Sequence, residues 1–256
     1  MDVLVCVKRV PATGGTIPLT PDGTDVDTRN LGFTIGPHEE CAVEEAAQIV
    51  EHHGGSATVL TVGPPQADEQ LRYAMSMGIQ HGVRVGTQEG ETAPEATAAA
   101  IVQAVRTLES EHRRFDLMLF GTESADAGNA QVGIRVAHSL ARPIVGGIKG
   151  IELHPEDATA RLRRELPEGI EVYEVPLPAA VGVREGINLP RYPPVTGRLR
   201  AKRAQIRTIE PELEPGGLRR LRLRPPPEAA QDPVVLGHGA EAAKPVVDKL
   251  TELGMV

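Results

Sequence analysis

Aromatic side chains are nearly absent from this sequence, which contains no Trp, three Tyr and three Phe among its 256 residues. Proteins that bind single-stranded nucleic acid stack bases on aromatic platforms, so this deficit argues against that class of partner. The formal net charge of −8 argues against it too, because nucleic-acid-binding surfaces have an excess of Lys and Arg. We therefore expect no nucleic-acid partner.

Cysteines and long apolar runs are also scarce. Cys6 and Cys41 are the only cysteines, and Cys6 lies inside an expected buried strand, so a reducing compartment fits better than a disulfide framework. No apolar run is long enough to span a bilayer, and the N-terminal residues enter a strand at once, without a signal-peptide pattern. We expect a cytoplasmic protein with no direct membrane insertion.

Common catalytic signatures are missing as well. The sequence has no Gly-x-Ser-x-Gly elbow, no Gly-Lys-Ser/Thr phosphate loop, no His-Glu-x-x-His and no Gly-x-Gly-x-x-Gly at a strand–helix turn. Five histidines lack Cys or carboxylate partners at the spacing of a metal site: His38, His52, His53, His81 and His112. We expect no catalytic residue and no metal.

What the sequence does contain is a regular alternation of short apolar runs and helical patterns up to residue 140. The expected strands are 2–7, 57–62, 83–85 and 116–120, and the expected helices are 37–53, 64–77, 94–112 and 134–140. Strands separated by helices of this length form right-handed crossovers. The predicted fold is α/β, with an open, mostly parallel, doubly wound sheet in a Rossmann-like three-layer arrangement of the adenine-nucleotide-binding kind.

The pattern changes after residue 143. Four further strands are expected at 144–153, 160–164, 170–175 and 179–183, joined by short turns that predict an antiparallel extension of the sheet. From Arg184 onward Pro and Gly dominate, and only residues 239–253 regain helical spacing. We expect an α/β nucleotide-binding domain at 1–195 and an extended Pro-rich C-terminal arm with a terminal helix at 196–256. A small hairpin is expected within 13–34.

One loop has the features of a phosphate site. It reads Gly121-Thr-Glu-Ser-Ala-Asp-Ala-Gly-Asn-Ala-Gln-Val-Gly133 and lies between a buried strand and a helix. The unpaired N–H groups of Asn129, Ala130, Gln131 and Val132 at the helix start suit an anion. Glu123 and Asp126 are candidates for polar contacts with a ligand. A ligand-free structural turn uses Gly and Asn as well, and the residues alone leave both interpretations open.

Three stretches together resemble one family, the β subunit of electron transfer flavoprotein, also known as the FixA family. They are Val3-Leu-Val-Cys-Val-Lys-Arg-Val10, Gly36-Pro-His-Glu-Glu-Cys-Ala-Val-Glu-Glu-Ala46, and the segment 182–203 with Asn188-Leu-Pro-Arg-Tyr192. The likeness follows the order of the chain and includes its Pro-rich tail. The Asn-x-Pro-Arg-Tyr loop, followed by a basic stretch, is its most specific motif.

The resemblance implies an electron carrier subunit rather than an enzyme. It implies a heterodimer with an α subunit that contains most of the FAD site. Electrons pass from acyl-CoA or other dehydrogenases to that FAD, and on to the electron transfer flavoprotein–quinone oxidoreductase. In such a heterodimer the β subunit binds AMP without redox activity and docks the dehydrogenases.

Carried over by position, the resemblance also implies two sets of site residues. The AMP pocket would use Cys6, Gly36, Pro37, His38, Glu39, Val62, Gly121, Thr122, Glu123, Ser124, Asp126, Asn129, Ala130, Gln131 and Val132. The loop that docks dehydrogenases would use Arg184, Ile187, Asn188, Leu189, Pro190, Arg191 and Tyr192, with Ile187 as its apolar anchor.

This sequence departs from the family pattern at the nucleotide loop. Thr122-Glu-Ser124 replaces a stretch with a lysine, and Ala130-Gln-Val132 lacks the usual hydroxyl. The Ala-Gln-Val-Gly form resembles the electron-bifurcating branch, in which a second FAD occupies the AMP position. We favour AMP and keep the second FAD as the alternative.

Two other classes of protein share a related sheet, and one feature of the sequence argues against each. A nucleotide-binding regulatory protein of the universal-stress type would end soon after its last core strand, whereas this chain continues far beyond residue 184. An ATP-pyrophosphatase needs a Ser-Gly-Gly-x-Asp-Ser loop after the first strand, and Val7-Lys-Arg-Val-Pro11 is not such a loop.

Overall fold

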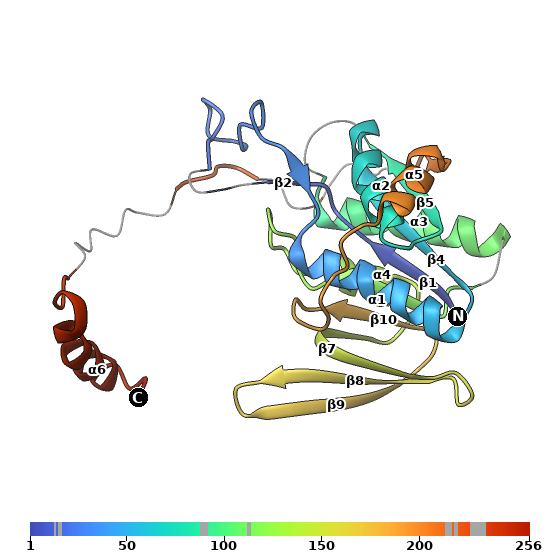
Figure 1. Cartoon of the computed structure of the whole chain (residues 1–256). Helices are drawn as coiled ribbons and strands as arrows, with labels where there is room; N and C mark the ends of the chain where they lie inside the picture. The colour runs from blue at the N-terminus through green and yellow to red at the C-terminus, as the bar shows by residue number, and fades with distance from the viewer. Residues whose placement is uncertain are drawn as a thin grey trace. The chain divides into compact units, whose positions relative to one another are not determined.

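The first strand lies in the middle of a nine-stranded sheet in the computed structural model (Figure 1). β1 (Asp2–Cys6) pairs in parallel with β4 (Ser56–Gly63) on one side and with β6 (Leu117–Gly121) on the other. Val3, Leu4 and Val5 are fully buried because helices cover both faces of a parallel sheet. The expected doubly wound α/β sheet is confirmed.

The strand order is β11-β5-β4-β1-β6-β10-β7-β8-β9, and the strands from β11 to β7 are parallel. β8 and β9 are antiparallel and form the expected extension. The remaining strands of the sheet are β5 (His81–Gly86), β7 (Ile144–His154), β8 (Thr159–Leu166), β9 (Gly169–Pro176), β10 (Ala179–Val183) and β11 (Ile206–Ile209).

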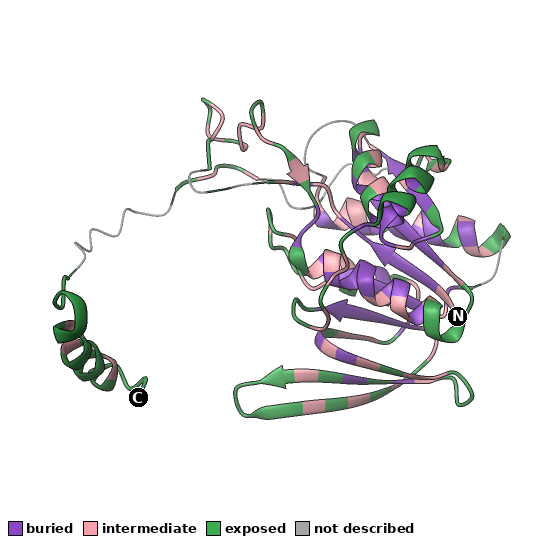
Figure 2. Cartoon of the chain, in the orientation of Figure 1, coloured by how far each residue is buried: buried purple, intermediate pink, exposed green. Residues whose placement is uncertain are grey.

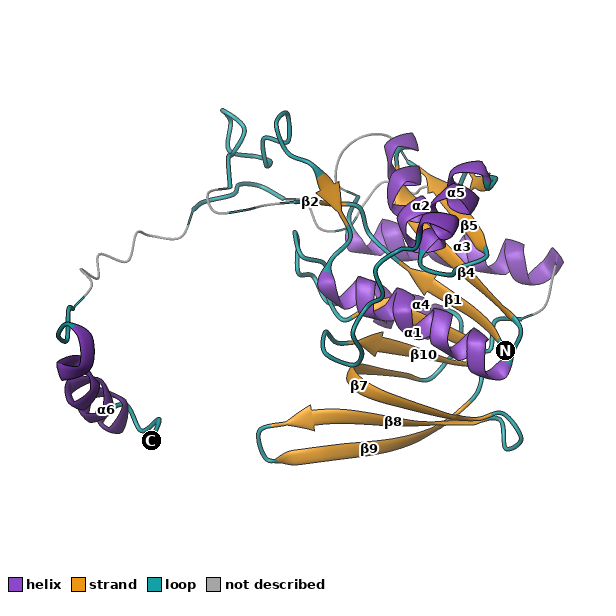
Figure 3. Ribbon diagram, viewed as in Figure 1, coloured by secondary structure: helices purple, strands orange, loops and turns teal. Residues whose placement is uncertain are grey.

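Helices form a layer on each face of the sheet (Figure 3). α1 (Pro37–His53), α2 (Asp68–Ser76) and α5 (Val195–Arg203) pack on one face, and the short helix η1 (Pro65–Ala67) precedes α2. α3 (Pro94–Glu111) and α4 (Val132–Ser139) pack on the other face. Alternate residues of β1 point to opposite layers, Val3 toward α1 and Leu4 toward α3, which gives the expected three-layer core.

The structure corrects the expectation that residues from 196 onward are extended. Residues 195–203 form α5, and β11 adds a parallel strand next to β5. Arg72 explains the position of α5, because its Nη1 donates to the carbonyl oxygens of Ala201 and Ala204 at 2.5 and 3.1 Å. The sequence contains too few apolar residues here to predict either element, and docking on α2 and β5 supplies the missing stabilisation.

The small hairpin expected within 13–34 is present as a bridge between Leu19 and Val26. β2 (Val10–Pro11), which precedes this hairpin in the chain, and β3 (Phe33–Thr34), which follows it, form a two-stranded antiparallel sheet. The segment between β1 and α1 therefore leaves the main sheet and forms this small two-stranded sheet before α1 begins.

The structure describes residues 1–12, 14, 17–87, 92–111, 114–212, 217, 220–225 and 234–256. His112, the expected end of α3, lies outside these residues. Contacts divide the chain into Met1–Arg222 and Leu223–Val256. The second unit contains η2 (Gly239–Ala242) and α6 (Ala243–Glu252), whose residues are exposed or half-buried (Figure 2). No helix in the described ranges is long and apolar enough to cross a membrane.

Candidate nucleotide site and docking loop

The loops after β1 and β6 begin at the same edge of the sheet. The chain runs from β1 outward to β4 and β5, and then returns past β1 to β6. Neighbouring parallel strands whose connections leave in opposite directions create a crevice at their carboxyl ends, where open α/β sheets bind ligands. Here this switch point lies at the ends of β1 and β6, where Cys6 is paired with Phe120, and we call this edge the crevice.

Glu39 is a buried carboxyl group at this edge. It is the third residue of α1, and its Oε2 accepts the N–H of Gly36 at 2.6 Å while Oε1 accepts the N–H of Lys8 at 2.9 Å. Burial raises the pKa of Glu39 to about 7, against the lowering effect of these two hydrogen bonds. A Cβ on Gly121 would lie 2.8 Å from Cγ of Glu39, so the glycine lets α1 approach β6. Pro37 occupies the first turn of α1, where a missing N–H costs nothing.

Lys8 and Asp126 form an ion pair between the loops that follow β1 and β6. Nζ of Lys8 lies 2.8 Å from Oδ1 and 2.7 Å from Oδ2 of Asp126. Burial acts to raise the pKa of Asp126, but the charge and hydrogen bond of Lys8, with help from the Ser124 hydroxyl, outweigh it and lower the pKa. The crevice therefore contains a cation and a carboxylate that are paired with each other.

We call residues 122–131 the nucleotide loop. Thr122 fixes its start, because the backbone N–H and the hydroxyl both donate to the carbonyl oxygen of Val183 at 2.9 Å. Gly128 and Ala130 have φ angles of +58° and +53°, which turn the chain toward α4. Gln131 precedes α4 without a side-chain capping bond. The first N–H groups of α4 have no acceptor within the helix and suit an anion.

Two of the predicted pocket residues direct their side chains elsewhere. Cys6 is 8% exposed and packs in the core beneath α3 and α4, where burial raises the pKa of its thiol. Val62 packs against the same core cluster. Only their backbone groups lie at the edge of the sheet. Asn129 and Ala130 are exposed in the nucleotide loop.

We call residues 184–192 the docking loop, and Arg191 attaches its end to α1. The Arg191 guanidinium donates to Glu44 from Nε and Nη2, at 2.8 and 3.0 Å, and to Glu51 from Nη1 and Nη2, at 2.5 and 2.9 Å. Asn188 adds hydrogen bonds from Nδ2 to the Cys41 carbonyl at 3.0 Å and to Oε2 of Glu45 at 2.9 Å. The loop is thus ordered on the helix.

The docking loop exposes different apolar residues from the one that the resemblance implies. Ile187 is half-buried and packs against the core, whereas Leu189 is 90% and Tyr192 82% exposed. The guanidinium of Arg198 lies 4.8 Å from the centroid of the Tyr192 ring. Leu189 rather than Ile187 is the side chain that projects.

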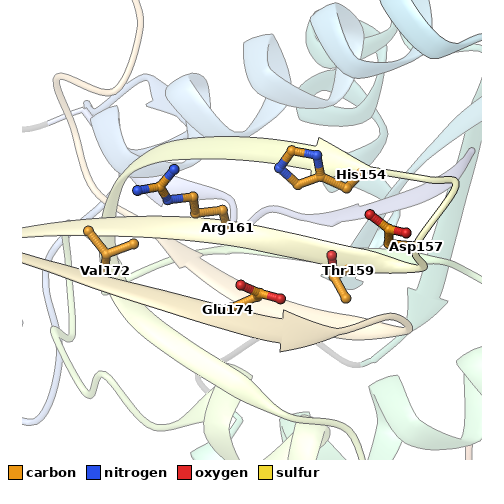
Figure 4. A pocket seen from close by; sticks show the side chains of 6 residues that line it. All are labelled: His154, Asp157, Thr159, Arg161, Val172 and Glu174. Atoms are coloured by element: carbon orange, nitrogen blue, oxygen red, sulfur yellow. The ribbon is translucent and has the colours of Figure 1, made fainter.

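A hollow of about 410 Å³ lies elsewhere, on one face of the antiparallel extension (Figure 4). It is lined by His154, Asp157, Thr159, Arg161, Val172 and Glu174. Arg161 is paired in register with Glu152 and Glu174 on the neighbouring strands. The hollow is formed by β7, β8 and β9 and is separate from the crevice between β1 and β6.

The prediction from sequence omits Lys8 and Arg135 from the site. Lys8 directly follows the first strand, and this position at the carboxyl edge is the signal that points to it. Nε of Arg135 donates to Oε1 of Gln131 at 3.0 Å, and Nη2 donates to Glu95 at 3.1 Å. The spacing of four residues between Gln131 and Arg135 on one helix predicts the first of these contacts.

Comparisons with known proteins agree with this architecture. The family model for the electron transfer flavoprotein domain matches residues 24–214. The electron transfer flavoprotein subunit beta of Bacillus subtilis (strain 168) is 31% identical over 98% of this chain and 97% of its own length. The caffeyl-CoA reductase-Etf complex subunit CarD of Acetobacterium woodii is 31% identical over 77% of this chain and 73% of its own. The acryloyl-CoA reductase electron transfer subunit gamma of Anaerotignum propionicum is 28% identical over 98% of both chains.

The matched region begins at residue 24 and includes α1, the nucleotide loop and the docking loop. It therefore contains most of the site described above, and a full-length relative named as a β subunit shares nearly a third of its residues with this chain. From these matches, the chain belongs to the electron transfer flavoprotein β-subunit family, whose members are electron carriers.

Proposed function

We propose that this chain forms a heterodimer with an electron transfer flavoprotein α subunit and binds AMP in the crevice between β1 and β6. In this proposal it completes an FAD site that lies mostly in the α subunit. Its docking loop receives acyl-CoA or other dehydrogenases, so that electrons reach the FAD and pass on to a quinone oxidoreductase. The observation that supports the nucleotide site best is the uncapped start of α4 at the switch point of the sheet.

The groups at the crevice match the chemistry of AMP. The backbone N–H groups at the start of α4 suit the phosphate, and the ammonium group of Lys8, which contacts Asp126 of the nucleotide loop, supplies a positive charge. The carboxylates of Glu123 and Asp126 are acceptors of the kind that ribose hydroxyls or an amino group require. Lys8 thereby replaces the lysine that the nucleotide loop lacks.

The C-terminal unit supports the proposed heterodimer. None of the described residues of α6 is buried, and Val247 and Leu253 are 54% and 60% exposed. A short amphipathic helix gains most of its stability by packing its apolar stripe against another surface. We assign that surface to the α subunit. FAD supplies the redox chemistry, and the residues of this chain bind nucleotide and dock partners.

Counting cofactors in the purified heterodimer tests this function. The chain is co-expressed with the α subunit of its own organism, and the nucleotides extracted from the complex are quantified. One AMP and one FAD per heterodimer is the expected result. Two FAD and no AMP would instead identify the bifurcating type, which the relatives named as subunits of reductase complexes make the second candidate. A colourless chain that binds ATP as a monomer would refute the proposal.

Lys8→Met tests the AMP site directly. Losing a charge-assisted contact should weaken AMP binding about tenfold, with FAD content unchanged. Lys149→Met is the matched control, because Lys149 also forms an ion pair, with Glu165 at 3.0 Å, but lies on β7. Equal AMP affinity in both variants would place the nucleotide elsewhere.

A further inference from the structure

The nucleotide loop and the docking loop leave neighbouring strands of the sheet. β6 and β10 are parallel and in register, with Gly121 opposite Val183. The carbonyl oxygen of Val183 accepts both hydrogen bonds of Thr122, so the first residue of one loop is bonded to the residue that precedes the other. A movement at the start of the nucleotide loop can therefore displace the start of the docking loop through these hydrogen bonds.

His38 makes a second connection between the two loops. Its Nδ1 accepts the backbone N–H of Glu185 in the docking loop at 2.8 Å. Its Nε2 lies 3.9 Å from Oε1 of Glu123 in the nucleotide loop. His38 lies in the first turn of α1, close to the end of β6. The approach is tight, because a Cβ on Gly121 would lie 3.2 Å from the Cβ of His38.

The chemistry of imidazole makes these two contacts interdependent. A ring nitrogen accepts a hydrogen bond only when it has no proton, so the bond from Glu185 requires the neutral tautomer with its proton on Nε2. A carboxylate near Nε2 favours that tautomer, as Glu123 is placed to do. We propose that His38 is a positioning residue through which the nucleotide loop controls the order of the docking loop at Glu185.

The rest of the docking loop does not depend on this contact. Arg184 donates its N–H to the carbonyl oxygen of Ile148 at 2.9 Å, and Arg191 is bound to Glu44 and Glu51. Between these fixed points, His38 is the side chain that bonds the backbone at Glu185. The proposal therefore predicts a local effect rather than loss of the whole loop.

Other charged groups near His38 have contacts of their own. On α1 the adjacent Glu39 accepts two backbone N–H groups, and across the crevice Lys8 is paired with Asp126. On the docking loop, the side chain of Glu185 is exposed. A variant that changes only His38 therefore leaves these contacts in place.

Amide hydrogen exchange at Glu185 in the purified heterodimer tests the proposal, which rests on the proposed function. His38→Ala removes the acceptor, whereas His38→Asn retains an oxygen near the position of Nδ1. His154→Ala is the matched control, because His154 also lies near carboxylates, at 3.7 and 3.8 Å, but on the antiparallel extension. We expect exchange at Glu185 to rise about tenfold in His38→Ala and to stay unchanged in the other two variants.

Coupling to the nucleotide loop is tested with Glu123→Ala and with AMP. Glu123→Ala should raise exchange at Glu185 in the wild-type background and have no effect in His38→Ala. Removing AMP from the heterodimer should also raise amide exchange at Glu185, and only when His38 is present.

The outcomes separate the two proposals. A heterodimer that contains no nucleotide would refute the proposed function whatever the exchange rates. A heterodimer that contains AMP and FAD, but shows the same exchange at Glu185 in the wild type and in His38→Ala, would overturn the role of His38 alone. Equal effects of Glu123→Ala with and without His38 would overturn the coupling.

Discussion

Arg191 and Glu44, which are 147 residues apart in the sequence, form a bidentate ion pair with Nε–Oε2 and Nη2–Oε1 distances of 2.8 and 3.0 Å. The side chain of Glu44 is only 4% exposed. Burial acts to raise the pKa of Glu44, but the hydrogen bonds from Arg191 and Gln48 outweigh burial and lower it. The carboxylate thus depends on the docking loop for its charge partner, and the loop depends on the helix for its shape.

Arg191→Lys should weaken docking without changing cofactor content. Lysine cannot bind two carboxylates through a planar fork, so the variant should lose about 1–2 kcal/mol of stability and dehydrogenase docking should weaken several-fold. The measurements are the unfolding midpoint of the heterodimer and the dehydrogenase concentration at half-maximal electron transfer. Arg207→Lys is the control, because Arg207 pairs with the more exposed Glu111. Similar losses in both variants would contradict the role given to Arg191.

The exposure of the docking loop separates two substitutions that the sequence does not distinguish. Leu189→Ala should weaken dehydrogenase coupling with little change in the unfolding midpoint, since this side chain is 90% exposed. Ile187→Ala should instead cost about 1–2 kcal/mol of stability because Ile187 packs against the core. Flavin content should be unchanged in both. Loss of flavin in Leu189→Ala would argue against a docking role.

Glu39 should make the stability of the protein depend on pH near neutrality. The folded-state pKa of about 7 lies above the ordinary value of 4.5, so this group stabilises the fold fully below about pH 4.5 and less as the pH rises through 7. Between pH 5 and 8, the wild type should therefore lose up to about 3 kcal/mol relative to Glu39→Gln.

The check on Glu39 is the unfolding midpoint of the heterodimer at fixed protein concentration across that range. Glu40→Gln is the control, since Glu40 occupies the next position of α1 and is only half-buried. A constant difference between the wild type and Glu39→Gln at every pH would show that Glu39 does not titrate in this window.

Gly121→Ala should separate β6 from α1. The new Cβ would lie 2.8 Å from Cγ and 3.3 Å from the backbone nitrogen of Glu39, so helix and strand must move apart at a cost of about 1–3 kcal/mol. We expect a lower unfolding midpoint and weaker AMP binding. Gly146→Ala on β7 has open space around its Cβ and should be neutral. Equal behaviour of the two variants would mean that the crevice tolerates the change.

The order of elements follows from local patterns in the sequence. Buried strands such as 57–62 are continuous apolar runs in the sequence. Pro37, two acidic residues and an apolar stripe that ends at Gly54 predict α1. These signals depend on neighbours within a few residues, so they predict the βαβ succession and the antiparallel extension. They predict neither α5 nor β11, whose stability comes from contacts with α2 and β5.

The candidate site likewise has features that the sequence predicts and features that depend on tertiary contacts. The sequence by itself determined the family and the loops at the carboxyl edge, because strand ends and motifs are properties of the chain. Only the tertiary structure decided that Glu39 is buried, that Leu189 projects while Ile187 packs inward, and that His38 touches both loops. Burial, exposure and pairing between residues far apart in sequence are set by which strands lie side by side, and that arrangement exists only in the folded sheet.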